Sequence, residues 1–202
     1  MRVYLALYAA SDSNIAILRQ YPPYIHRLLN PDIAEAMEES VHKGEPLGFW
    51  SSMLGARKPR DRPKPPVFLP PEGNTLDLDK AWHGLHFLLT GAAGATLPPL
   101  DFLVAGGSQI GPEEDGLLAL SADETRAIAA ALAPLTREQL LARYVPVRMR
   151  ELAIAPPDRW QEVEEPEFFE GDFIWVFEYF EQLQAFLIEA AANGLGVVKE
   201  FS

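Results

Sequence analysis

Two histidines and an aspartate fall on one side of a predicted helix near the middle of the chain. Asp79, His83 and His86 are spaced by four and then three residues, which is the spacing of side chains that share a helix face. Neutral imidazole and carboxylate are ligands for zinc, nickel or manganese. The same groups also suit a general base with an orienting acid. This face is therefore a candidate metal, ligand or acid–base site.

The same pattern also has a purely structural explanation. His86 would then be a half-buried core histidine that bonds to the backbone, and His83 would be solvated. The pair lacks the glutamate of the HExxH zinc motif, and the spacing shows no third ligand. His26 and His42 lie far away in the sequence, and the chain has no GxSxG elbow for serine chemistry. The sequence therefore assigns no catalytic residue, and it does not decide whether the histidines bind a metal ion.

The helix that positions these residues has a start, a buried stripe and an end. We expect Asp77 or Asp79 to cap its N-terminus. Gly91 is expected to end it in a left-handed conformation. The apolar residues at helical spacing are Leu78, Trp82, Leu85 and Leu89.

A long glycine-rich segment, about 91–116, follows this helix. A loop of that length in a compact domain is often functional, and Glu114 or Asp115 would complete the histidine site. Its glycines match neither the GxxxxGK[ST] phosphate loop nor the GxGxxG dinucleotide motif. We therefore expect a pocket wall here and no cofactor.

The chain is acidic and contains no cysteine. It has 202 residues, 48% of them hydrophobic, and a formal net charge of −12; the length and apolar content suit one folded domain. The negative charge argues against nucleic acid or an anionic membrane as a partner. No apolar run approaches the roughly 20 residues that cross a bilayer. The lack of cysteine excludes disulfides and thiolate chemistry and fits a cytoplasmic location.

The negative charge is concentrated near the C-terminal third. Nine acidic residues and one basic residue lie between Asp158 and Glu181. This segment is a candidate partner surface, a solvated loop, or a contact for the basic stretch at 57–64. The acidic residues that would form the partner surface are Glu162, Glu164, Glu165, Glu167 and Glu170.

The pattern of elements predicts an α+β fold, with one helix-rich domain over residues 1–202 and a small sheet. The sheet is expected to unite a first strand at 2–8, a buried strand at 117–120 and a last strand at 196–201. An irregular proline-rich loop is expected at about 55–73. Helices are expected at about 11–21, 24–29, 30–42, 77–90, 121–133, 136–144, 146–154 and 172–192.

Three of these helices have specific start signals. Ser121 with Glu124 and Thr136 with Gln139 are capping boxes, and Pro146 suits a first helical position. The longest helix, at 172–192, carries an aromatic stripe at helical spacing, which is typical of a core contact.

The order of these segments resembles the YfbM-like family of uncharacterised bacterial proteins. The resemblance rests on the segments 76–91, 106–111 and 120–124, and continues through 143–144, the long C-terminal helix and 197–198. It covers the chain from about 74 onward. It implies a compact α+β bacterial domain in the cytoplasm, and no activity or catalytic residue. The positions that such a family would share are Asp79, Trp82, His86 and Thr90.

The sequence therefore favours a non-enzymatic binding or interaction protein with an acidic surface, including one that neutralises a basic partner. The alternative is a small enzyme, or a metal- or ligand-binding protein, that uses the helix face with Asp79, His83 and His86. A third hypothesis is an accessory domain that docks through the apolar residues Phe49 and Trp50. The sequence leaves the oligomeric state open.

Overall fold

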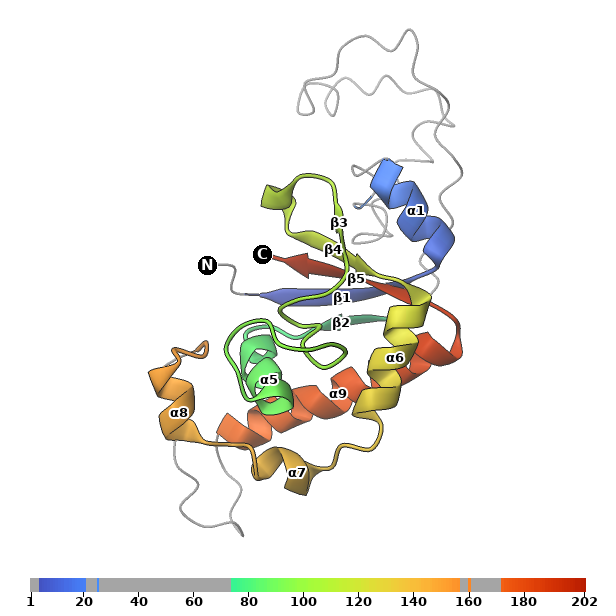
Figure 1. The fold of residues 1–202 in the computed structure, drawn as a ribbon. Coiled ribbons are helices and arrows are strands. Elements are labelled where there is room, and N and C mark those ends of the chain that lie inside the picture. The colour runs from blue at the N-terminus through green and yellow to red at the C-terminus, as the bar shows by residue number, and fades with distance from the viewer. Residues whose placement is uncertain (1–3, 21–24, 26–73, 157–159, 161–171) are drawn as a thin grey trace, which may run out of the picture.

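The protein folds around a five-stranded antiparallel sheet (Figure 1). The computed structural model describes residues 4–20, 25, 74–156, 160 and 172–202. The order across the sheet is β2-β1-β5-β4-β3. The three predicted strands are central and adjacent, which confirms an α+β fold whose sheet includes the first and last strands. The strands are β1 (Leu5–Ala10), β2 (Thr75–Asp77), β3 (Ser108–Ile110), β4 (Leu117–Leu120) and β5 (Gly196–Phe201).

Helices lie on both faces of this sheet (Figure 1). One face packs against α5 (Ala81–Thr90), α6 (Ala122–Leu132) and α9 (Asp172–Ala192). The opposite face carries α1 (Asp12–Gln20). Two short helices, α7 (Arg137–Leu141) and α8 (Pro146–Glu151), follow α6 before the end of the described range 74–156.

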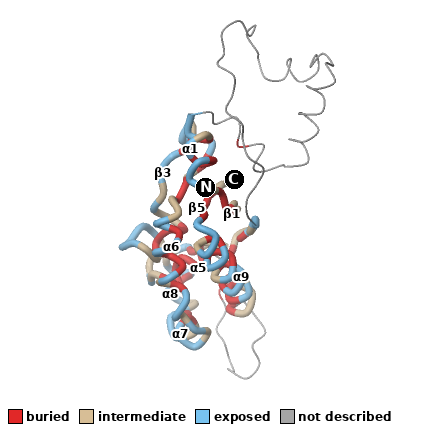
Figure 2. The backbone as a smooth tube through the Cα atoms, turned by 90° about the vertical axis from the view of Figure 1, so that its right-hand side faces the viewer, coloured by how far each residue is buried: buried red, intermediate tan, exposed pale blue. Residues whose placement is uncertain are grey.

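Alternation along the strands divides the core between the two faces, because successive strand residues point to opposite sides. Leu5 and Leu7 of β1 belong to the larger cluster, which includes the apolar sides of α5, α6 and α9. Val198 of β5 belongs to a second cluster with Ile15 and Leu18 of α1. Figure 2 shows the buried residues concentrated in the sheet and on the inner sides of α6 and α9.

The predicted helix starts are confirmed in detail. Ser121 and Thr136 each accept a hydrogen bond from the backbone three residues later and receive the reciprocal bond, so both capping boxes form. Pro146 is the first residue of α8. The long helix has the predicted bounds, and its aromatic stripe, which includes Phe173 and Phe180, is buried.

Other parts of the prediction were wrong. The central helix begins at Ala81, and residues 75–77, which we had partly placed in it, form strand β2. The long loop contains β3 and a short 3₁₀ turn, η2 (Glu113–Asp115), which form a hairpin with β4. Strands of three residues carry too little alternation to be recognised, and they form because a longer neighbour offers them hydrogen bonds.

No helix in the described part of the chain is long and apolar enough to cross a membrane. The predictions for 24–29, 30–42, Phe49 with Trp50, and the proline-rich loop at about 55–73 fall outside the described residues, apart from Ile25, which is helical and buried.

Candidate functional site

Both histidines of the candidate site are buried inside the protein. His86 has no exposed surface and His83 is 8% exposed. The prediction of a polar helix face is therefore wrong. The segment after α5 folds back over this side of the helix, and its backbone replaces the solvent that we expected there.

His83 uses both of its ring nitrogens for structural hydrogen bonds. Its Nε2 donates to the carbonyl oxygen of Ala93 at 3.1 Å, because its Nδ1 accepts from the backbone N–H of Ala155 at 3.0 Å. These two bonds fix one neutral tautomer. Neither nitrogen is free for a metal ion, and the prediction of a solvated His83 is wrong.

His86 ties the same loop to the helix. Its Nε2 donates to the carbonyl oxygen of Gly94 at 2.8 Å, which confirms the core histidine bound to backbone. Its Nδ1 is buried and has no hydrogen-bond partner in the described part of the chain. Burial lowers the pKa of His86, and also that of His83, because the interior disfavours the imidazolium ion.

Asp79 does not lie on the helix with the histidines. It sits in the turn before α5 with a left-handed φ of 46°, a region that aspartate tolerates better than most residues. Its backbone N–H donates to Oδ1 of Asp77 at 2.7 Å. The residue at the N-cap is Lys80, with no side-chain cap. The expected caps at Asp77 or Asp79 do not form, because the Asp77 carboxylate stabilises this turn instead.

Asp115 also lies apart from the histidines. It belongs to the exposed η2 turn at the tip of the β3–β4 hairpin. Among the described residues, no three histidine, aspartate or glutamate side chains form a group that could hold a metal ion. The four predicted ligands Asp79, His83, His86 and Asp115 are all described, and the structure brings only the two histidines together.

The lowered histidine pKa values predict that acid destabilises this protein. Between pH 7 and pH 5 the unfolded histidines take up protons at their ordinary pKa of about 6.5, while the folded ones, whose pKa is lower, take up fewer. Stability is therefore full above pH 6.5 and falls as the pH drops below it. The urea concentration at the midpoint of unfolding should therefore decrease as the pH is lowered from 7 to 5.

A His86→Gln variant separates titration from the hydrogen bond. Glutamine Nε2 keeps a donor for the Gly94 carbonyl oxygen, and it carries no titratable group. The acid slope should become smaller in this variant than in the wild type. An unchanged slope would show that buried His86 does not cause it.

A second buried polar group was missed from the sequence. Lys199 on β5 has no exposed surface, and its ammonium group donates to the carbonyl oxygens of Phe102, Ala105 and Gly106 at 2.6, 3.2 and 3.1 Å. Burial lowers the pKa of Lys199 to about 8, partly offset by the negative charge of Asp101. The sequence did contain a signal of this burial, because Lys199 lies two residues after the apolar Val197 and both must face the same side of the sheet.

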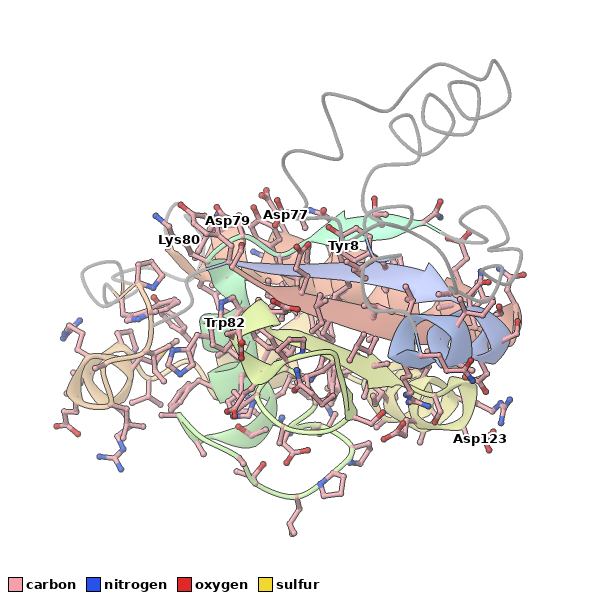
Figure 3. The ribbon with its side chains drawn as sticks, turned by 90° about the horizontal axis from the view of Figure 1, so that it is seen from above. Tyr8, Asp77, Asp79, Lys80, Trp82 and Asp123 are labelled. Atoms are coloured by element: carbon pink, nitrogen blue, oxygen red, sulfur yellow. The ribbon has the colours of Figure 1, made fainter. Side chains whose placement is uncertain are left out.

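Several acidic side chains lie around the sheet edge formed by β2, where Figure 3 shows Asp77 and Asp79 close together. Burial is the main cause of a raised pKa at Tyr8, and Glu200 and then Asp77 raise it further. The Tyr8 hydroxyl donates a hydrogen bond to Glu200 Oε2 at 2.9 Å. Burial, followed by Asp79, Asp77 and Glu178, raises the pKa of Tyr179 on α9. We call Asp77, Asp79, Glu178 and Glu200 the acidic edge.

One basic side chain lies beside the acidic edge. The ammonium group of Lys80 is 5.4 Å from the centre of the Tyr4 ring, a distance typical of a cation–π contact. Figure 3 shows Lys80 next to Asp77 and Asp79. The predicted partner surface of Glu162, Glu164, Glu165, Glu167 and Glu170 lies outside the described residues.

Comparisons with known proteins relate this chain to a family without an assigned activity. A comparison of the sequence with curated proteins found no match. The fold is similar to the crystal structure of a protein of unknown function, YfbM, from Escherichia coli. The two share 20% sequence identity, with a TM-score of 0.58 over 98% of this chain and 99% of that one. At this identity the likeness concerns the fold alone.

The family model described as Domain of unknown function (DUF1877) matches residues 1–199. This match and the structural likeness confirm the predicted resemblance to YfbM-like proteins. The chain belongs to the DUF1877 family, a domain of unknown function.

Proposed function

We propose that this chain is a non-enzymatic binding protein of the bacterial cytoplasm that recognises a basic partner through an acidic surface. The observation that carries this proposal is the acidic edge, in which Asp77 acts on Tyr8 together with Glu200 and on Tyr179 together with Asp79 and Glu178. The net charge of −12 gives the whole chain the same sign. Such a field speeds the approach of a cationic protein and disfavours acidic competitors.

Strand β2 offers the partner hydrogen bonds as well as charge. Thr75 is paired with Tyr8, and Asp77 with Ala6. The residues within each of these two pairs are not hydrogen-bonded to each other, because in an antiparallel ladder bonded and non-bonded pairs alternate. The bonded pairs are the neighbouring ones, in which Leu78 donates to Leu5 and Ala9 donates to Asn74. The backbone groups of Thr75 and Asp77 therefore point away from β1. An extended basic segment would bond to them while its side chains meet the carboxylates.

The alternative function, a small enzyme or metal-binding protein that uses the Asp79, His83 and His86 face, has little support from this geometry. Three of the four imidazole nitrogens are bonded to backbone groups, and Asp79 lies in the preceding turn. Stoichiometric metal in protein purified without an affinity tag would restore that alternative.

The proposal predicts a basic protein partner that is released by salt. Tagged protein should recover it from source cells at low ionic strength and lose it at high ionic strength, because salt screens surface charge. A triple variant, Asp77→Asn, Asp79→Asn and Glu178→Gln, should recover about tenfold less. Mass spectrometry of the recovered proteins measures both effects.

A matched control removes the same charge elsewhere. Glu113→Gln, Glu114→Gln and Asp115→Asn neutralise the η2 turn beside β3, at the other side of the sheet. This variant should recover the partner as the wild type does. A third variant that neutralises Glu164, Glu165 and Glu167 tests the acidic segment outside the described residues. A partner whose recovery ignores salt and survives both the acidic-edge and the acidic-segment variants would contradict the proposal.

A further inference from the structure

A small cavity lies where the C-terminal end of α9 meets the start of β2. It is half open to solvent, and its volume is about 120 Å³. It is therefore large enough for a planar head group of a few heavy atoms. Its lining combines polar side chains with apolar ones, namely Asn74, Glu189 and Asn193 with Ala9, Phe186 and Leu195.

Among the described residues, the polar part of the lining carries a negative charge and no positive one. The side-chain amide of Asn74 donates from Nδ2 to Glu189 Oε2 at 2.8 Å, so it orients the carboxylate. Within the described residues the other oxygen, Oε1, has no hydrogen-bond partner. The amide oxygens of Asn74 and Asn193 are further acceptors.

The end of α9 adds to this negative potential. The helix runs for 21 residues and ends at Ala192, next to the cavity residue Asn193. The C-terminal end of a helix carries a partial negative charge that favours cations. A cation at this place would therefore meet both the helix dipole and the Glu189 carboxylate.

The apolar part of the lining is a rigid floor of the cavity. Phe186 and Leu195 are both 7% exposed and form part of the main core, so they are fixed in place. They leave little apolar surface open, so the charged head group, and not the alkyl chain behind it, would occupy the cavity.

We propose that this cavity binds an alkyl-guanidinium or alkyl-ammonium group, the chemistry at the ends of arginine and lysine side chains, with Glu189 as the counter-charge. The lining contains none of the acidic edge. The site therefore stands whether or not that edge binds a basic partner.

The test is a titration of the full chain, followed by amide NMR shifts, with acetyl-Ala-Arg-Ala-amide as the probe. We expect a dissociation constant of about 1–10 mM, which is typical of a few small contacts, with the largest shifts in the side-chain amides of Asn74 and Asn193. The same peptide with citrulline in place of arginine has the shape without the charge, and it should not bind. Equal binding of the citrulline peptide, or no shift with arginine, would overturn the proposal.

Two variants locate the site. Glu189→Gln should weaken binding at least tenfold while circular dichroism shows an unchanged fold, because Glu189 is exposed. Glu181→Gln makes the same change on the same helix outside the cavity, and it should bind normally. Full binding by Glu189→Gln would also overturn the proposal. Asp77→Asn should leave the titration unchanged, so a failure of the acidic edge is seen separately.

A second probe identifies the source of the cation. If the peptide binds more tightly than propylguanidine, the site is built for a side chain of a protein. If propylguanidine binds more tightly, the site is built for a free small cation. Equal affinity means that the head group alone is recognised, and all three results support the proposal.

Discussion

Replacing Gly196 with alanine should lower the free energy of unfolding by about 3 kcal/mol, the upper range for overpacking a close-packed site. A Cβ at this position would lie 2.4 Å from the carbonyl oxygen of Leu120 and 2.7 Å from Cδ1 of Ile15. The first contact is with the backbone of β4, so a change of side-chain rotamer cannot relieve it. Strands β4 and β5 would have to separate where β5 also pairs with β1. Urea unfolding monitored by circular dichroism measures the loss.

Two other glycines serve as controls for this variant. A Cβ at Gly94 meets nothing within 4 Å, and Gly94→Ala should change stability by less than about 0.5 kcal/mol. A Cβ at Gly194 also meets nothing, but its φ of 66° is left-handed, so Gly194→Ala should cost about 1 kcal/mol. If Gly196→Ala is no worse than Gly194→Ala, the close approach to β4 does not limit this position.

Replacing Lys199 with methionine should lower the free energy of unfolding at pH 7 by about 3 kcal/mol. Methionine fills a similar volume but leaves the carbonyl oxygens of Phe102, Ala105 and Gly106 without their shared donor. These oxygens lie in the segment that leads from α5 to β3, and Phe102 is buried, so its carbonyl oxygen would lose its donor without gaining water. Hydrogen exchange should show faster opening of residues 101–107 in the variant, alongside the loss in urea unfolding.

The difference between wild type and Lys199→Met should also depend on pH. The pKa of Lys199 is about 8 in the folded protein, below its ordinary value of about 10.4. Above pH 8 the unfolded chain therefore holds a proton that the folded chain has released, and wild-type stability rises with pH relative to the variant. The gap should widen by about 1 kcal/mol per pH unit up to pH 9.5. A constant gap would mean that Lys199 keeps its proton throughout.

Local signals in the sequence predicted several elements correctly, because the interactions involved span only a few residues. The capping boxes at Ser121 and Thr136 join residues three positions apart. The long helix from Asp172 to Ala192 was predicted from a repeating apolar stripe. The central strands could be recognised because each is a run of apolar or alternating residues, whereas β2 and β3 have three residues each and depend on their neighbours.

The candidate site was harder to predict, because its state depends on contacts between distant segments. The spacing of His83 and His86 correctly placed them together on a helix. Whether that face met solvent was decided by Ala93, Gly94 and Ala155, whose backbone groups bond the imidazoles. The acidic edge likewise joins β2 to residues of α9 and β5.

The sequence by itself determined the kinds of elements, the membership of the family and the excess of negative charge. Helix periodicity, capping and net charge are properties of short windows or of composition. Only the tertiary structure decided that the histidines are buried, that Lys199 serves three carbonyl groups, and that Glu189 borders a cavity. Burial and polar partners depend on which surfaces meet, whereas local spacing indicates at most the face that a residue occupies, as it does for Lys199 beside Val197.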